Sequence, residues 1–235
     1  MTNDAVLAVQ GLQAWYGDSH VLHGVDLKVR KGQTVTILGR NGAGKSTTLK
    51  AIMGLVRKRK GAIMLNGRDI ASIPLHDVAR RGLGFVPEER GIFASLSVRE
   101  NLLLPPRVAT GGFSIEEIDH LFPNLSERSA SQGTKLSGGE QQMLAIARTL
   151  RTGANVLLLD EPTEGLAPVI VQRIGHVIRQ LRERGMTVLL VEQNFRFARK
   201  ISDYYYVMED GKIIDSFSEQ ERPSRMERLQ VTLGL

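Results

Sequence analysis

The feature that most constrains the fold of this chain is a glycine-rich stretch, Gly39-Arg-Asn-Gly-Ala-Gly-Lys-Ser46. It matches the phosphate-binding loop pattern G-x-x-x-x-G-K-S at every defined position. Four small residues let the backbone form a concave turn whose N–H groups point at anionic oxygens: Gly39, Gly42, Ala43 and Gly44. Lys45 would supply a cation to the terminal phosphates, and Ser46 a hydroxyl ligand to a magnesium ion. The sequence therefore predicts a nucleotide site with Mg²⁺.

The residues on both sides of this loop support the prediction. Residues 33–38 are rich in β-branched side chains and indicate a short buried strand, whereas residues 46–54 indicate a helix that ends at Gly54. Strand, loop and helix then follow in the order that places phosphate at a helix N-terminus. The alternative is an ordinary turn between a strand and a helix, which the matched flanks disfavour. The residues predicted to bind ATP also include Arg40, Asn41 and Thr47.

Two carboxylates, Asp160 and Glu161, directly follow the apolar run of residues 156–159. Such a run is typical of a buried parallel strand, and open α/β sheets bind ligands at the carboxyl ends of their strands. Asp160 is placed to hold magnesium through water or a hydroxyl, and Glu161 to orient and deprotonate an attacking water molecule. A solvated helix-cap pair is the alternative interpretation.

A third motif, Leu-Ser-Gly-Gly-Glu-Gln-Gln, occupies residues 136–142. Ser137 and Glu140 have capping-box spacing, and the apolar residues that follow continue one helical face. Taken alone, this pattern predicts only the start of a helix. Gly138 and Gly139 add exposed backbone N–H groups at that start, where a helix N-terminus could press on an anion.

The order of strand and helix patterns predicts an α/β fold with a mainly parallel sheet flanked by helices. The 235 residues, 42% of them hydrophobic, suffice for one large domain with a continuous core. The segments expected are antiparallel strands within 5–36, a hairpin at 62–67, a mainly helical insert at 88–153, buried strands at 156–160 and 187–191 with an amphipathic helix from Pro168 between them, and a closing hairpin at 204–217.

The distribution of charge and the absence of cysteine limit the kinds of partner that the sequence predicts. The net charge is +6, but the 31 basic and 25 acidic residues are mixed except at Arg57-Lys-Arg-Lys60, expected in a loop. That run could contact RNA or an anionic membrane leaflet or simply be solvated, and no nucleic-acid partner is expected from it. The chain has no cysteine and no signal or membrane-spanning pattern. It is expected to be soluble, or held at a membrane by another protein.

Together, GRNGAGKS, LSGGEQQ and LLLDEP closely resemble the motifs of the ABC-type ATPases, and the resemblance covers essentially residues 1–235. It implies one ABC-type ATP-binding domain, built from a P-loop NTPase core, an antiparallel β subdomain and a helical subdomain at about 88–153. It also implies that two ATPase domains pair head to tail, so that Ser137, Gly138, Gly139 and Glu140 contact the ATP bound by the partner. Tyr16 matches the aromatic residue that stacks on adenine, although such a residue near a strand end is more often part of a core.

Two positions depart from the commonest pattern of that family. Glu88 stands where a Gln usually links the magnesium site to the helical subdomain, and Gln193 stands where a switch His usually contacts the γ-phosphate. Gln193 can donate a hydrogen bond but cannot carry a proton near neutral pH. Glu161 must therefore act as the base. The resemblance thus implies Glu161, Lys45 and Gln193 as catalytic residues and Ser46, Asp160 and Glu88 at the metal.

These departures are similar to those of ATPase subunits of branched-chain amino-acid importers and of related urea or amide importers, as are VPEERGIF, DEPTEGLAP and VEQN. The resemblance implies a cytoplasmic ATPase at the inner face of the membrane. Its partners would be permease subunits, an identical or homologous second ATPase and, indirectly, an extracytoplasmic solute-binding protein. Two alternatives stay open: a non-transport ABC ATPase, although no long heptad insertion or second ATPase domain is present, and an ATP-binding sensor, although Lys45, Asp160 and Glu161 are intact.

Overall fold

The computed structural model describes residues 5–234, whose strands form two separate sheets. The larger sheet has the strand order β10 (Lys212–Ser218), β9 (Tyr204–Glu209), β3 (Thr34–Leu38), β8 (Thr187–Glu192), β7 (Val156–Asp160) and β6 (Leu83–Val86). All neighbouring pairs are parallel except β9 with β10. Every residue of β3, β7 and β8 is buried, as expected for parallel strands covered on both faces. The predicted mainly parallel sheet and its closing hairpin are confirmed.

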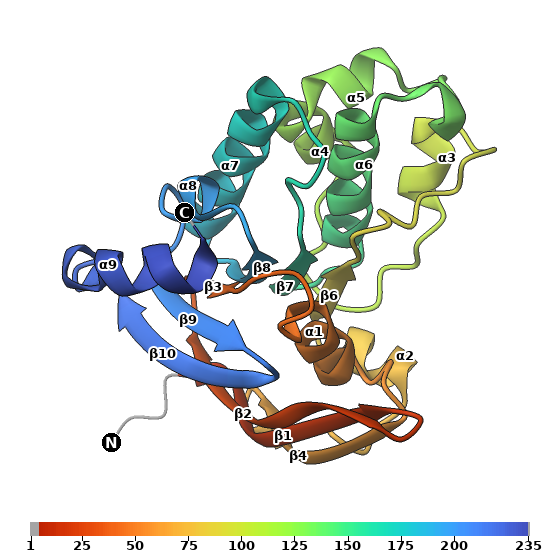
Figure 1. Cartoon of the computed structure of the whole chain (residues 1–235). Helices are drawn as coiled ribbons and strands as arrows, with labels where there is room; N and C mark the ends of the chain where they lie inside the picture. The colour runs from red at the N-terminus through yellow and green to blue at the C-terminus, as the bar shows by residue number, and fades with distance from the viewer. Residues whose placement is uncertain (1–4, 235) are drawn as a thin grey trace.

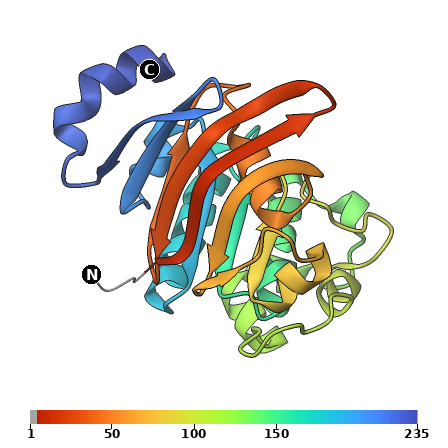
Figure 2. The same ribbon diagram turned by 90° about the horizontal axis from the view of Figure 1, so that it is seen from below.

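The smaller sheet is antiparallel; it lies below the larger one in Figure 1 and in front of it in Figure 2, which is seen from below. Its order is β2 (Ser19–Arg30), β1 (Ala5–Tyr16), β4 (Lys58–Leu65) and β5 (Arg68–Asp69). Strand β2 alternates buried Val25, Leu27 and Val29 with exposed charged residues, which is the pattern of a sheet with one wet face. Asn66 and Gly67 both have positive φ values, of 50° and 72°, and form the predicted tight turn between β4 and β5.

The loop predicted at Arg57-Lys-Arg-Lys60 is wrong, because Lys58, Arg59 and Lys60 belong to β4. They pair with residues of β1 at Gln13–Trp15. Arg59 donates hydrogen bonds to the carbonyl oxygens of Val56 and Ala71, at 2.8 and 2.6 Å, and the Lys58 ammonium lies 5.7 Å from the centroid of the Trp15 ring. Backbone pairing with a neighbouring strand therefore overrides the polar composition of this segment.

Helix α1 (Lys45–Met53) lies between the two sheets (Figure 1). Its buried residues form one core with the inner face of the antiparallel sheet and one face of the parallel sheet. Gly54 ends the helix in a left-handed conformation with φ of 88°, as its position after the helix predicts. This sandwich fixes the N-terminus of α1 at the carboxyl end of β3, where the glycine-rich loop connects them.

The opposite face of the parallel sheet is covered by a second core. Leu157 and Leu159 of β7 belong to this core, whereas Val156 and Leu158 belong to the first, in keeping with the two-residue period of a strand. The helices of the segment 88–153 are α3 (Val98–Leu103), α4 (Ile115–Leu121), α5 (Pro123–Glu127), the short 3₁₀ helix η1 (Gly133–Lys135) and α6 (Gly138–Arg151). The predicted amphipathic helix is α7 (Pro168–Glu183), which stands beside α6 in Figure 1.

Three helices were not anticipated: α2 (Leu75–Arg80), α8 (Phe195–Ala198) and α9 (Arg222–Leu233). Helix α9 covers the outer edge of the larger sheet, where Leu229 and Leu233 join a small core with Tyr205 and Phe217. Within residues 5–234, no helix combines the length and the apolar character needed to cross a bilayer.

Candidate nucleotide site

The glycine-rich loop is shaped by close contacts that exclude side chains. A Cβ atom at Gly39 would lie 2.6 Å from the carbonyl oxygen of Met208, and one at Gly44 would lie 2.9 Å from Leu22. Gly44 also has a φ of 103°, which favours glycine. No side chain in the described chain caps the N-terminus of α1. The N–H groups of its first turn therefore face the loop and are available to an anion.

Lys45 and Glu161 meet at the centre of the site. The Lys45 side chain is 3% exposed, and its Nζ lies 2.9 Å from Oε1 of Glu161 and 3.1 Å from the carbonyl oxygen of Arg40. Glu161 leaves the end of β7 in a left-handed conformation, with φ of 41°. That conformation costs a non-glycine residue roughly 1–2 kcal/mol, and here it turns the carboxylate toward Lys45.

The side chains of Ser46 and Asp160 bring two hard oxygen atoms together. The Ser46 hydroxyl donates a 2.7 Å hydrogen bond to Oδ1 of Asp160, whose other oxygen, Oδ2, is buried without a hydrogen-bond partner in the described residues. Burial raises the pKa of Asp160, against the bond from Ser46, which lowers it. An orphaned buried carboxylate oxygen beside a hydroxyl fits Mg²⁺. Residues 5–234 hold no cluster of three or more His, Cys, Asp or Glu residues that could by itself hold a metal ion.

A cavity of about 440 Å³ brings most of the predicted residues together. Its lining is Tyr16, Val21, Asn41, Gly42, Gly44, Lys45, Ser46, Thr47, Glu88, Glu161 and Glu164. Tyr16 is half exposed at its mouth, and Gly39, Arg40 and Ala43 belong to the loop behind it. The sequence analysis missed Glu164, whose pKa is raised by burial and by its hydrogen bond to Glu161. Of the remaining predicted residues, Asp160 is fully buried beside Ser46 and does not line the cavity, and neither do Gln193 and residues 137–140.

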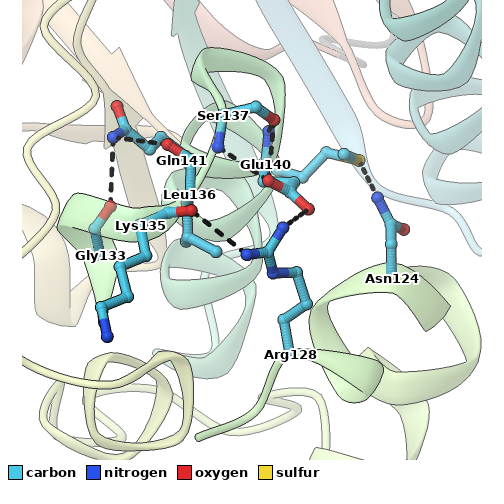
Figure 3. A network of polar contacts seen from close by, with 9 residues as sticks. Asn124, Arg128, Gly133, Lys135, Leu136, Ser137, Glu140 and Gln141 are labelled. Atoms are coloured by element: carbon cyan, nitrogen blue, oxygen red, sulfur yellow. Dashed lines mark hydrogen bonds and ion pairs between the residues drawn. The ribbon is translucent and has the colours of Figure 1, made fainter. Parts of the chain in front are cut away.

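The motif at residues 136–142 begins helix α6 with a complete capping box (Figure 3). Oε2 of Glu140 accepts hydrogen bonds from the backbone N–H and the hydroxyl of Ser137, at 2.7 and 2.8 Å, and Oε1 pairs with Arg128 at 3.2 Å. Burial alone would raise the pKa of Glu140, but these bonds from Ser137 and Arg128 lower it below its ordinary value. The carboxylate of Glu140 is therefore fully engaged in its own chain, while Ser137 is exposed at the helix start.

The two glycines of this motif also lie close to neighbouring side chains. A Cβ atom at Gly139 would lie 2.6 Å from Ile170 at the start of α7, and one at Gly138 would lie 3.2 Å from the Arg90 guanidinium. Arg90 follows Glu88 in the chain, has a φ of 66°, and donates a 3.0 Å hydrogen bond to Oε1 of Gln141. The loop that carries Glu88 is thereby joined to the start of α6, a link that the sequence analysis did not foresee.

Glu192, the last residue of β8, is a buried carboxylate that sequence reasoning also missed. It is 2% exposed. Its Oε1 accepts a 2.7 Å hydrogen bond from the Thr163 hydroxyl, and its Oε2 accepts a 3.1 Å bond from the backbone N–H of Asn194. Burial raises the pKa of Glu192 to about 7, and the hydrogen bonds from Thr163 and Asn194 only partly offset this effect.

This raised pKa makes a testable prediction for stability. The folded chain holds the Glu192 proton more tightly than the unfolded chain, so the wild-type free energy of unfolding should fall as the pH rises between 4.5 and 7. Glu192→Gln removes this titration. Relative to the wild type, the variant should gain about 3 kcal/mol over that interval. Urea unfolding of both proteins below pH 4.5 and above pH 7 measures the gain, and an equal difference at both pH values would contradict it.

A family model described as ABC transporter matches residues 22–164 of the chain. The high-affinity branched-chain amino acid transport ATP-binding protein BraG of Pseudomonas aeruginosa is 42% identical over 218 residues, covering 89% of this chain and 91% of the relative. The lipopolysaccharide export system ATP-binding protein LptB of Haemophilus influenzae is 35% identical over 235 residues, covering 98% of both. A solved ATP-binding subunit of an ABC transporter is 27% identical with a TM-score of 0.82, covering 98% of this chain and 100% of that one.

Proposed function

The chain belongs to the ABC transporter family as an ATP-binding, ATP-hydrolysing subunit, and we propose that it powers the import of branched-chain amino acids. The observation that carries the ATPase part of this proposal is the convergence of Lys45, Ser46, Asp160 and Glu161 on one phosphate-binding loop. The cargo rests on the relative that is 42% identical over 89% of the chain.

We assign phosphate binding to the loop and to Lys45. The uncapped N–H groups of α1 and the loop backbone would hold the phosphates, and Lys45 would exchange its contact with Glu161 for the terminal phosphate. Ser46 and Asp160 would hold Mg²⁺, with Glu88 acting near it from the cavity wall. When bound, the ion would neutralise charge on the transferring phosphoryl group.

Glu161 is the proposed base. Once Lys45 binds phosphate, the Glu161 carboxylate is free to orient a water molecule and accept its proton. Gln193 follows directly after β8 and is exposed, so its amide could donate a hydrogen bond to the terminal phosphate. Because an amide neither gains nor loses a proton near neutral pH, the base role stays with Glu161.

We further propose that ATP pairs two such subunits. Ser137, Gly138 and Gly139 would contact the γ-phosphate held by a partner, with Glu140 fixing the Ser137 cap. Each charge-assisted hydrogen bond across the interface would contribute roughly 1.5–3 kcal/mol and would disappear after hydrolysis. The link from Arg90 to Gln141 would pass this motion between the Glu88 loop and α6, and so to permease subunits at the cytoplasmic face of the membrane.

Tyr16 supplies a prediction on base recognition. If its half-exposed ring stacks on adenine, Tyr16→Ala should weaken ATP binding about tenfold, because one stacked base contributes roughly 1–3 kcal/mol. Tyr16→Phe keeps the ring and should bind ATP like the wild type. Isothermal titration of both variants with ATP and with inorganic triphosphate separates the effects. An equal loss for inorganic triphosphate would show that Tyr16 does not contact the base.

The cargo is tested by purifying the chain in mild detergent and identifying the membrane proteins that accompany it. Permease subunits reconstituted with this chain in vesicles should take up leucine, isoleucine or valine in an ATP-dependent manner when a solute-binding protein is supplied. A specific relative favours a second candidate, lipopolysaccharide export, because the LptB protein matches 98% of the chain. Copurification with an exporter complex and no amino-acid uptake would favour that candidate, and urea or amide uptake would favour the related importers.

A further inference from the structure

We propose that Glu192 is a positioning residue for ATP hydrolysis, whose side chain holds the loop that carries Glu161 and the turn that carries Gln193 in one fixed relation. The inference rests on the roles proposed above for Glu161 and Gln193. It concerns a residue that touches neither nucleotide nor metal in those assignments. Its support is the geometry between the ends of two neighbouring strands.

Strand β7 is paired in parallel with β8 up to its last residue, Asp160, which lies opposite Val191, and Glu192 follows as the last residue of β8. The backbone N–H of Glu161 still donates a 3.2 Å bond to the carbonyl oxygen of Val191, but the left-handed turn at Glu161 then takes the chain out of the sheet. Two residues later, the Thr163 hydroxyl returns to Glu192 at 2.7 Å. The position of Glu161 is thereby fixed twice, by the hydrogen bond of its own N–H to Val191 and by the hydrogen bond of Thr163, two residues later, to Glu192.

The second oxygen of Glu192 fixes the turn that follows β8. It accepts the 3.1 Å bond from the Asn194 N–H, so that the carboxylate spans Gln193. The Asn194 side chain in turn caps α8 by accepting a 3.1 Å bond from the N–H of Phe197. Gln193 therefore lies between two anchored residues, while its own side chain stays exposed.

The chemistry of the contact explains which side chains can make it. Two donors converge on one buried group, and an apolar residue would leave the hydroxyl of Thr163 and the N–H of Asn194 without this partner. The amide of Gln can serve both, since its oxygen accepts from Asn194 and its NH₂ donates to the Thr163 hydroxyl, which can also accept. A Leu of similar size can serve neither. Glu192→Gln should therefore preserve the positioning, and Glu192→Leu should abolish it.

The test compares these two variants with Thr163→Val in the assembled transporter, with rates normalised to the number of ATP-binding sites. For Glu192→Leu we expect kcat to fall about 30-fold with KM within twofold, because two hydrogen bonds of about 1 kcal/mol are lost. Thr163→Val should lower kcat about fivefold. Glu192→Gln should stay within threefold of the wild type. The double variant Glu192→Leu, Thr163→Val should be no slower than Glu192→Leu alone, because both changes remove the same contact.

Three results would overturn the inference. The first is a wild-type kcat in Glu192→Leu. The second is a fall in kcat in Glu192→Gln as large as that in Glu192→Leu. The third is a fall in the ATPase rate of Glu192→Leu that is fully explained by a smaller number of ATP-binding sites. If Glu192→Leu does not fold, Thr163→Val decides alone, and an unchanged kcat in it rejects the proposal. Glu161→Gln measured in the same assay separates the two levels of the account. An active Glu161→Gln contradicts the proposed base, whereas an inactive one beside a fully active Glu192→Leu contradicts the positioning role only.

Discussion

Glu161→Gln should lower ATP turnover of the assembled transporter by about a thousandfold and leave ATP affinity undiminished. The structure gives two reasons. Glu161 is the carboxylate that the left-handed end of β7 turns into the nucleotide cavity, and an amide in its place cannot accept the proton of an attacking water molecule. The same carboxylate also occupies Lys45, at 2.9 Å, so its neutralisation releases the lysine for phosphate.

This expectation is measured by steady-state ATPase assays and by equilibrium binding of ATP to the same preparation. Glu183→Gln is a matched control, because it makes the same chemical change at an exposed position at the end of α7. That control should turn over ATP at the wild-type rate. Hydrolysis by Glu161→Gln within a few fold of the wild type would refute the assignment of the base.

The second large effect concerns pairing. Ser137→Arg should leave ATP binding by the isolated subunit intact but block the ATP-dependent association of two subunits. Ser137 is exposed at the start of α6 and does not line the cavity of its own chain, so a bulky cation there should leave that cavity intact and obstruct the surface at which we propose that a partner binds. Sedimentation of Glu161→Gln subunits, with and without the change at Ser137, measures the association because slow turnover preserves the ATP-bound pair.

Ser137→Ala controls for the helix cap. Both changes remove the Ser137 hydroxyl, which accepts from the Glu140 N–H, at a cost of about 1 kcal/mol in the stability of α6. Only arginine adds bulk and charge. If the alanine variant pairs and the arginine variant does not, the interface itself is responsible. Pairing by both variants would count against a role of this motif in trans.

Much of the fold follows from local patterns in the sequence. Runs such as residues 156–159 are apolar and short, and they form strands that are buried on both faces because helices cover the sheet. The basic segment Lys58–Lys60 fails this reasoning, since its strand structure depends on pairing with β1, which no local pattern contains. Helix α9 escapes prediction for a similar reason, as its apolar residues gain a partner only from the outer edge of the folded sheet.

The candidate site, too, could be predicted from the sequence only in part. The loop residues could be identified because the phosphate-binding pattern is contiguous, and Asp160 and Glu161 could be identified because they come at the end of a strand. The contacts of Glu192 with Thr163 and of Arg90 with Gln141 join segments 29 and 51 residues apart. Burial of Glu192 and the positive φ of Arg90 are consequences of tertiary packing, so the motifs VEQN and VPEERGIF, which contain these residues, do not indicate their roles.

In the proposed mechanism, ATP is held between two subunits. The chain contains no cysteine, so single thiols can be introduced without background. One preparation carries Ser137→Cys, and a second, whose chain is made longer so that the two can be told apart, carries Asn41→Cys at the exposed rim of the loop. Both also carry Glu161→Gln. The two preparations are mixed and treated with a short bifunctional thiol reagent. A cross-link between the two chains is expected with ATP and none with ADP. Cross-linking that is equally efficient without nucleotide, or absent with ATP, would contradict this mechanism.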